Sequence, residues 1–260
     1  MYCVLLFMSN DLSRGKLSDL SNLMADDGDE LHFCSACAFS AACIDAGYDK
    51  QRLAELHCLV EHVGPYQAGG YVFRTGDPFR AIFAVRGGMV KTVQTDTQGE
   101  DHVLGFYLPG EIVGLNAIYP EHFPCDAVVL DTTYLCRFSF PAMSALASRM
   151  PVLQQHLFRL LSKELGTALV LAGDHTADQR MAAFLVDLGR RFKARGFSGT
   201  RFRLSMSRAD MASHLRLAAE TVSRVLGRFR NQAWIRVDGR EVELINVAQL
   251  DALARPLLDR

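Results

Sequence analysis

Residues 207–229 read SRADMASHLRLAAETVSRVLGRF, a stretch in which two short amphipathic helices are separated by a tight turn. Ser207 and Asp210 have the three-residue spacing of a helix capping box, so a short helix is expected to begin there. After a turn at 216–217, apolar residues recur at helical spacing from 218 to 229. The stretch therefore predicts a helix-turn-helix.

The outward face of the second helix carries polar side chains near its N-terminal end, where a recognition helix contacts base edges and phosphates. These candidate DNA-binding residues are Glu220, Thr221, Ser223, Arg224 and Arg228. Beyond them, residues 235–237 and 242–244 flank an Asp238-Gly239 dipeptide, which is the pattern of a β-hairpin with a tight turn. A hairpin at this place predicts a winged helix-turn-helix.

Charge divides the chain into an acidic body and a basic C-terminal third. Residues 174–260 carry 16 Lys+Arg against 10 Asp+Glu, whereas the whole chain has a formal net charge of -1. This excess indicates a surface for a polyanion such as double-stranded DNA. The sequence contains no Gly-rich phosphate loop, no HExxH and no Gly-x-Ser-x-Gly, so an enzymatic role is not expected.

Between residues 66 and 140 the chain consists of short alternating or apolar runs that glycine and proline interrupt. The expected strands are 71–73, 81–85, 89–93, 102–107, 127–130 and 133–136. Several short strands at this spacing predict an antiparallel barrel or sandwich.

A long helix is expected after Pro141, with an apolar seam of the kind that two identical helices bury between them. The seam residues are Leu157, Leu161, Leu165, Ala168 and Ala172. The seam predicts a homodimer, and the alternative is a helix that packs on its own sheet domain. A further helix near 177–195 is expected to bury Met181, Phe184, Leu185 and Leu188.

Three cysteines, Cys34, Cys37 and Cys43, fall within ten residues. In a reducing compartment this spacing indicates a metal or iron-sulfur loop more readily than disulfides. A helix is expected from 49 to about 63, with Leu53, Leu56, Leu59 and Val60 on one face. Residues 1–8 lack the features of a signal peptide, and no run reaches about 18 apolar residues. We therefore expect a cytoplasmic protein that does not associate with a membrane.

The order of sheet domain, long helix and winged helix-turn-helix resembles the cyclic-AMP receptor protein/FNR (CRP/FNR) superfamily of bacterial transcription regulators over nearly the whole chain. Within it the sequence is most similar to FNR, the oxygen-sensing fumarate and nitrate reduction regulator. Residues 220–229, ETVSRVLGRF, closely resemble the FNR recognition helix. The fold class implied is α+β, with an N-terminal antiparallel β-barrel of the cyclic-nucleotide-binding type, a dimerisation helix and a C-terminal winged helix-turn-helix.

The resemblance implies four parts of the chain. They are a flexible N-terminal segment (1–31), a cysteine loop with the β-barrel sensory domain (32–140), a dimerisation helix (141–173) and a winged helix-turn-helix DNA-binding domain (174–260).

Two macromolecular partners follow from the resemblance. Glu220, Ser223 and Arg224 would read each half-site of a palindromic promoter, since a guanidinium can bind guanine and a carboxylate can accept from cytosine. The apolar Ala219 before them favours TTGAT half-sites of the FNR type. RNA polymerase is the second partner, and the residues implied to contact it lie on a barrel hairpin, at Asp96, Gly99 and Glu100.

The cysteine spacing, with two residues between the first pair and five before the third, is that of FNR. The resemblance implies a fourth ligand on the last strand before the dimer helix, where the context of Cys136 matches better than that of Cys125. Four thiolates could hold a 4Fe-4S cluster, and tetrahedral zinc is the alternative. A haem sensor of nitric oxide or carbon monoxide is a further alternative, but it would leave the cysteines unexplained.

The implied mechanism is that an intact cluster clamps the cysteine loop onto the barrel and promotes pairing of two chains, whereas oxygen removes the clamp. Such a regulator would control genes of anaerobic metabolism. Ala168 stands where FNR has an acid that keeps apo chains apart, so apo chains are expected to pair more readily. No cyclic nucleotide is expected, because Leu115, Cys125 and Asp126 replace the glutamate and the Arg-Ser pair of the cyclic-AMP receptor protein.

Overall fold

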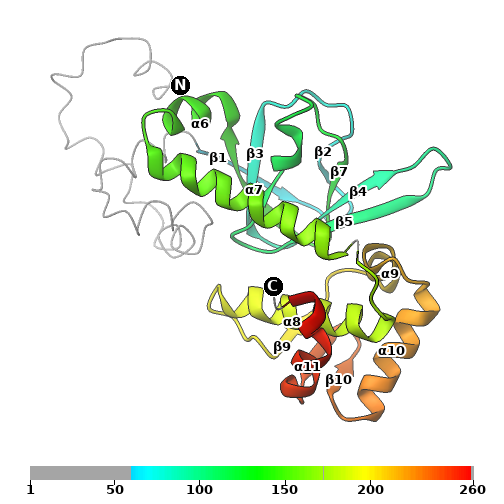
Figure 1. The fold of residues 1–260 in the computed structure, drawn as a ribbon. Helices are drawn as coiled ribbons and strands as arrows, with labels where there is room; N and C mark the ends of the chain where they lie inside the picture. Colours follow the sequence, from blue (N-terminus) through cyan, green and yellow to red (C-terminus); the bar gives the residue numbers. More distant parts are fainter. Residues whose placement is uncertain (1–59, 172, 259–260) are drawn as a thin grey trace, which may run out of the picture.

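The N-terminal domain contains two four-stranded antiparallel sheets (Figure 1). The computed structural model describes residues 60–171 and 173–258. The first sheet has the order β1-β8-β3-β6, with β1 Val60–Tyr66, β8 Thr133–Ser139, β3 Ala81–Gly87 and β6 Ile112–Val113. The second has the order β2-β7-β4-β5, with β2 Tyr71–Phe73, β7 Asp126–Val129, β4 Val90–Thr95 and β5 Asp101–Tyr107.

Alternate apolar residues of these strands form one shared core, because every second side chain of a strand points the same way. Phe73 stacks on Phe123 with ring centroids 3.7 Å apart, and Val129 and Leu135 are buried in the same cluster. The predicted antiparallel sheet domain is confirmed. In the part of the chain that is described, its ladders form two sheets rather than one closed ring.

Two helices, α6 (Phe140–Ala147) and α7 (Pro151–Leu171), follow the last strand and pack on the outer face of the first sheet. The prediction of one continuous helix from 141 is wrong at residues 148–150, where the chain leaves the helical path. Pro151 explains the break, since it has no N–H to bond to the carbonyl of Ala147 but fits the first turn of a new helix.

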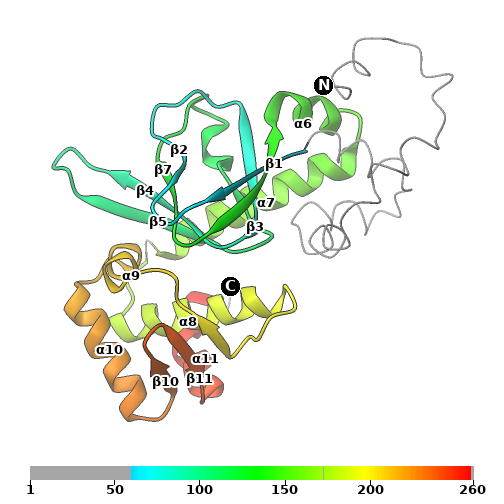
Figure 2. The same cartoon turned by 180° about the vertical axis from the view of Figure 1, so that it is seen from behind.

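The C-terminal domain is a three-stranded sheet surrounded by four helices (Figure 2). Capping boxes begin two of the helices, with Thr176 and Gln179 at α8 and Ser207 and Asp210 at α9. The predicted capping box at Ser207, the helix-turn-helix and the wing are confirmed. The elements are α8 Ala177–Lys193, β9 Arg201–Arg203, α9 Arg208–Leu215, α10 Ala219–Asn231, β10 Ile235–Asp238, β11 Glu241–Leu244 and α11 Val247–Leu258.

The helix predicted from 49 to about 63 is wrong in its last residues. Val60 to Val63 belong to β1 and pair with β8, with Val60 opposite Phe138 and His62 opposite Cys136. A ladder partner remote in sequence overrides the local helical pattern, and β-branched valines suit the strand. Residues 49–59 lie outside the described residues. Strands β6 and β9, the 3-10 helix η1 (Leu115–Ala117) and α11 have no predicted counterpart.

The largest buried cluster extends across both domains. It joins Val103, Phe106 and Leu108 of the second sheet and its following loop to the buried face of α8, which includes Met181 and Phe184. All four residues predicted to face inward on this helix are buried. No helix in the described ranges is long and apolar enough to cross a membrane.

Candidate nucleic-acid interface and metal-ligand residues

Helix α10 follows an extended Ala218 and buries one side in the core of the C-terminal domain. Its buried residues are Val222, Val225, Leu226 and Phe229. Because these positions recur at intervals of three and four residues, they fill one stripe of the helix and leave the opposite stripe to solvent. The packing of α10 therefore fixes which side chains face outward.

The three predicted base-reading residues, Glu220, Ser223 and Arg224, are exposed on that outward stripe. Arg224 Nη2 donates to Thr221 Oγ1 at 3.3 Å, and Ser223 Oγ donates to the carbonyl of Ala219 at 3.1 Å. Thr221 is half-buried. These side chains lie in the first turns of α10, the part of a recognition helix that reaches base edges.

Arg228 has a different environment. Its guanidinium forms an ion pair with Asp178 in the first turn of α8, so the side chain is directed to a neighbouring helix of the same domain. Arg228 is still about half exposed, at 49% of its side-chain surface. A phosphate contact would have to compete with this carboxylate, which distinguishes Arg228 from Arg224.

Arg180 is a structural anchor that the sequence does not reveal. Its Nη2 donates to the carbonyl of Gly173 at 2.9 Å, and its Nε donates to that of His175 at 3.2 Å. A longer contact of 3.5 Å joins Nη1 to the carbonyl of Leu215 at the end of α9. One guanidinium thus ties the segment after α7 to the helix-turn-helix.

The wing places two further arginines, Arg236 and Arg240, in the DNA-binding domain next to α10. Asp238 and Gly239 form its turn, with Gly239 at a φ of 57°, and Arg236 pairs with Glu243 across the hairpin at 2.6 Å. The exposed arginines of the domain surface include Arg201, Arg203, Arg230, Arg236 and Arg240. Arginines of this kind suit phosphate contacts, which position a protein on DNA without reading its sequence.

The two candidates for a fourth metal ligand lie in different cores. Cys136 of β8 is 6% exposed and packs on the outer face of the first sheet, in one cluster with Met143 of α6 and Leu153 of α7. Cys125 is 0% exposed in the core between the sheets, where burial raises the pKa of its thiol and Asn116 Nδ2 donates to it at 3.4 Å.

Cys34, Cys37 and Cys43 lie outside the described residues. Within the described ranges, no group of three or more His, Cys, Asp or Glu side chains is placed to hold a metal. Cys136 is nevertheless on the strand that pairs with β1, and His62 of β1 is its partner across the ladder. β1, the first described strand, therefore lies directly beside Cys136.

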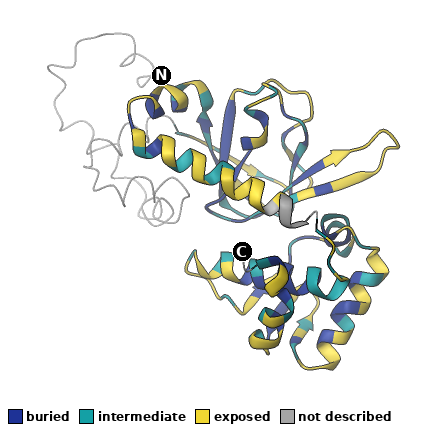
Figure 3. Ribbon diagram, viewed as in Figure 1, coloured by how far each residue is buried: buried dark blue, intermediate teal, exposed yellow. Residues whose placement is uncertain are grey.

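The predicted seam of α7 divides into two parts. Leu157 and Leu161 are half-buried against their own domain, which is the alternative that the sequence left open for them. Leu165 is 63% exposed and Ala168 is also exposed, whereas Ala172 lies outside the described residues. Phe158, not predicted as part of the seam, is 60% exposed. Figure 3 shows the solvent-exposed length of α7.

The predicted polymerase hairpin is the β4–β5 turn, and a single carboxylate organises it. Asp96 Oδ1 accepts from the amides of Gln98 and Glu100 at 2.8 and 3.0 Å, and Gly99 completes the turn with a φ of 87°. His102 lies 2.9 Å from Asp96 Oδ2, and its hydrogen bond is the largest cause that lowers the pKa of Asp96. The exposed Glu100 is thus held on a defined turn.

The residues at the nucleotide-binding positions of the cyclic-AMP receptor protein are also placed. Leu115 is buried at 5% exposure, and Asp126 Oδ1 accepts from the amide and hydroxyl of Thr75 at 2.7 and 2.9 Å. That the chain binds no cyclic nucleotide stays a prediction, based on the repulsion between the Asp126 carboxylate and a cyclic phosphate.

Comparison with known proteins gives two family models that together match most of the described chain. Residues 64–150 match the cyclic nucleotide-binding domain, and residues 179–253 match the Crp-like helix-turn-helix domain.

Similar proteins of known name are transcription regulators. The transcriptional activator protein Anr of Pseudomonas aeruginosa is 39% identical over 224 residues, which cover 85% of this chain and 92% of the relative. The fumarate and nitrate reduction regulatory protein of Escherichia coli is 36% identical and covers 85% of this chain and 90% of the relative. Among solved structures, FixK2 from Bradyrhizobium japonicum has a TM-score of 0.67 at 25% identity, covering 75% of this chain and 96% of FixK2.

Proposed function

Because the chain belongs to the FNR group of the CRP/FNR superfamily of DNA-binding transcription regulators, we propose that its DNA binding responds to oxygen through a 4Fe-4S cluster. Its relatives carry the names of transcriptional activators and regulators rather than of enzymes. Family membership gives a DNA-binding transcription regulator. The cofactor, the signal, the DNA site, the polymerase contact and the genes controlled are proposed here.

The proposed ligands of the cluster are Cys34, Cys37, Cys43 and Cys136. The observation that carries this choice is the place of Cys136, which lies beside β1 and under the first half of α7. Its apolar neighbours Met143 and Leu153 suit a thiolate ligand that water should not reach freely. Cys125 is less suitable, since the sheet core encloses it completely.

When bound, the cluster would supply iron-thiolate bonds that oxygen can break. The chain itself would convert that event into a change of assembly. Cys136 would hold the N-terminal part of the chain against the cluster of side chains that supports Leu153 and Leu157. Loss of that anchor would change the packing beneath α7 and weaken the pairing of two chains along the exposed face of this helix. A shift between mostly monomer and mostly dimer takes roughly 5 kcal/mol.

Pairing of two chains matters because a palindrome presents two identical half-sites, about one helical turn apart, to a symmetric dimer. We propose TTGAT half-sites, read by Glu220, Ser223 and Arg224. The ordered turn at Asp96 to Glu100 is the proposed contact with RNA polymerase. The genes controlled would be those of anaerobic metabolism.

The test starts with protein purified without oxygen, followed by iron and sulfide counts, a visible spectrum and titration of a TTGAT palindrome before and after exposure to air. About four irons and four sulfides per chain are expected, with colour and DNA binding lost together. One zinc, no colour and binding indifferent to air would contradict the proposal, and a sharp Soret band would identify haem instead.

Two matched variants locate the fourth ligand. Cys136→Ala and Cys125→Ala each remove one buried thiol, so their costs in packing are comparable. Only Cys136→Ala is expected to lower the iron content and make DNA binding independent of air. Iron loss in Cys125→Ala alone would assign the fourth ligand to Cys125.

A further inference from the structure

The C-terminal domain packs on the outer face of β4 and β5. Phe106 at the end of β5 contacts Phe184 of α8, with ring centroids 5.9 Å apart, and His214 of α9 at 5.1 Å. Val103 and Leu108 are buried in the same cluster as these aromatic residues. The two domains are therefore joined by a continuous apolar contact as well as by the chain between α7 and α8.

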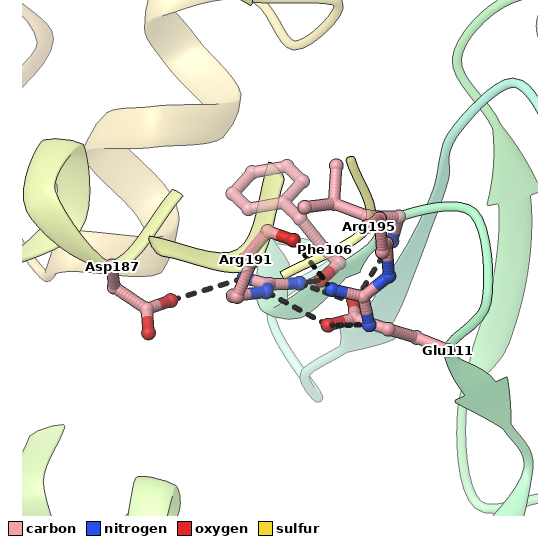
Figure 4. A network of polar contacts seen from close by, with 6 residues as sticks. Phe106, Glu111, Asp187, Arg191 and Arg195 are labelled. Atoms are coloured by element: carbon pink, nitrogen blue, oxygen red, sulfur yellow. Dashed lines mark hydrogen bonds and ion pairs between the residues drawn. The ribbon is translucent and has the colours of Figure 1, made fainter. Parts of the chain in front are cut away.

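A single buried carboxylate lies at the edge of this contact (Figure 4). Glu111 is 9% exposed, and its Oε1 is 2.9 Å from both Arg191 Nε and Arg195 Nη2. Its Oε2 accepts from Arg191 Nη2 at 2.5 Å and from the amide of Leu108 at 2.9 Å. Arg191 also donates to the carbonyl of Phe106 at 2.5 Å, so α8 is bound to the sheet domain through both charge and backbone.

The charge state of Glu111 favours this arrangement. Burial by itself would raise the pKa of the carboxyl, but the Arg191 and Arg195 guanidiniums hold it below its ordinary value. Glu111 is therefore ionised at neutral pH. Removal of one partner of a buried ion pair strongly destabilises the folded protein, because the other charge stays buried and uncompensated.

Two further polar contacts lie away from Glu111. Lys91 of β4 pairs with Asp210 of α9 at 2.5 Å. On the same helix, Ser213 Oγ accepts from the amide of Val103 at 2.9 Å and donates to the carbonyl of Asp101 at 3.0 Å. Because both α8 and α9 contact the sheet domain, the C-terminal domain is held against rotation relative to the sheet domain as well as against separation from it.

A further polar contact joins the domains at Asp131, beside the start of β4. Asp131 accepts from the amide of Met89 through Oδ1 and from Ser205 Oγ through Oδ2, both at 2.8 Å. Ser205 lies two residues before Ser207, the N-cap of α9, so the Asp131 carboxylate connects the sheet domain to the segment that leads into α9.

The docked arrangement leaves the base-reading side of α10 open. Glu220, Ser223 and Arg224 are exposed, although α9 next to them is covered by β5. We infer that the β4–β5 face is a docking platform that fixes the direction of α10 relative to α7 within one chain. We also infer that Glu111 is its main positioning residue, and that this docked form is the one that binds DNA. The inference uses only the DNA binding of the family and does not depend on the metal.

The test compares the full-length chain with its Glu111→Gln variant by two readouts. Hydrogen exchange of peptides from β5 and α9 reports docking, and binding to palindromes with different half-site separations reports the fixed direction of α10. The probe is the palindrome that the wild-type chain selects from a random duplex pool, so failure of TTGAT alone contradicts only the proposed function. Asp251→Asn is the matched control. It removes a carboxylate of α11 that pairs with Arg190, the neighbour of Arg191 on α8, and this pair lies inside one domain.

Glu111→Gln is expected to raise exchange in β5 and α9 at least tenfold and to weaken binding to the best palindrome at least tenfold. The penalty for inserting two base pairs between the half-sites should shrink, since a loosely held domain can adjust to either separation. Asp251→Asn should change neither readout. If Glu111→Gln does not fold, Lys91→Met tests the same expectations at a half-buried pair.

Two results would overturn the inference. Faster exchange with equal or tighter DNA binding would mean that the docked form is not the DNA-binding form. Unchanged exchange in Glu111→Gln, or in Lys91→Met where it replaces that variant, would mean that the pair tested does not hold the domains together.

Discussion

His214 of α9 lies edge-on to Phe106 of β5, with ring centroids 5.1 Å apart and an interplanar angle of 67°. Phe184 of α8 completes the group at 5.9 Å from the imidazole. An ionisable ring is thus enclosed by aromatic side chains at the contact between the two domains. Burial is the largest cause that lowers its pKa, from an ordinary 6.5 to about 4.

Stability is therefore expected to depend on pH through His214. A folded chain that holds the imidazole neutral binds fewer protons than the unfolded chain between about pH 6.5 and pH 4. The contribution is fully present above pH 6.5 and is lost as pH falls toward about 4, with an upper size of about 3 kcal/mol. Urea unfolding at a series of pH values would measure it.

The His214→Phe variant separates this contribution from that of other titrating groups. It keeps an aromatic ring next to Phe106 but cannot bind a proton. The difference in unfolding free energy between wild type and variant should change with pH only between about 4 and 6.5. A constant difference over that range would show that His214 is not held neutral.

Gly189 of α8 is expected to resist substitution because a neighbouring loop approaches its Cα closely. A Cβ at this position would lie 2.3 Å from the carbonyl oxygen of Gly199. Gly189→Ala should therefore destabilise the chain by about 1–3 kcal/mol in thermal or urea unfolding. Gly227→Ala is the matched control, since nothing lies within 4 Å of that Cβ in mid-helix and a gain of up to about 1 kcal/mol is expected. Equal effects of the two would contradict the steric explanation.

Arg190 and Arg191 show where the sequence is informative about the fold and where it is not. They are adjacent in one basic run, yet Arg190 pairs with Asp251 inside its domain and Arg191 crosses to Glu111, 80 residues away in the sequence. By contrast, the capping box at Ser207 could be predicted because its donors and acceptors are three residues apart. Periodicity describes such local contacts, whereas the partner of Arg191 is decided by domain docking.

The difference between local contacts and contacts set by packing also decides which parts of the candidate DNA-binding site could be predicted. The outward stripe of α10 could be predicted, since a helix that buries Val222 and Phe229 must expose the opposite side. The pairing of Arg228 with Asp178 could not, because it depends on how α8 crosses α10. The sequence contains one signal for the docking: Arg191 and Arg195 are four residues apart in the helix expected near 177–195, and such a pair can hold a single carboxylate.

Arg224 and Arg228 are expected to contribute to DNA binding in different ways. Arg224 is exposed near the start of α10, so Arg224→Ala should cost about 1–3 kcal/mol and relax the preference at one base pair of each half-site. Arg228 is paired with Asp178, so Arg228→Ala should cost less DNA-binding free energy, and the cost should be the same for all DNA sequences. Titrations of half-sites substituted one base pair at a time, at one salt concentration, would distinguish the two. Equal loss of specificity in both variants would contradict the assignment.

The exposed apolar line on α7 is expected to join two chains. Phe158 and Leu165 are seven residues apart, so they lie on nearly the same side of the helix, and both are more than half exposed. Leu165→Glu would place a charge in a contact that otherwise excludes water, and it should raise the dimer dissociation constant at least tenfold, or about 1.4 kcal/mol. Sedimentation of protein prepared without oxygen would measure this constant. Arg159→Glu is the control, because the exposed Arg159 is one residue beyond Phe158 and therefore about 100° around the helix. Equal weakening by the two variants would place the contact elsewhere on α7.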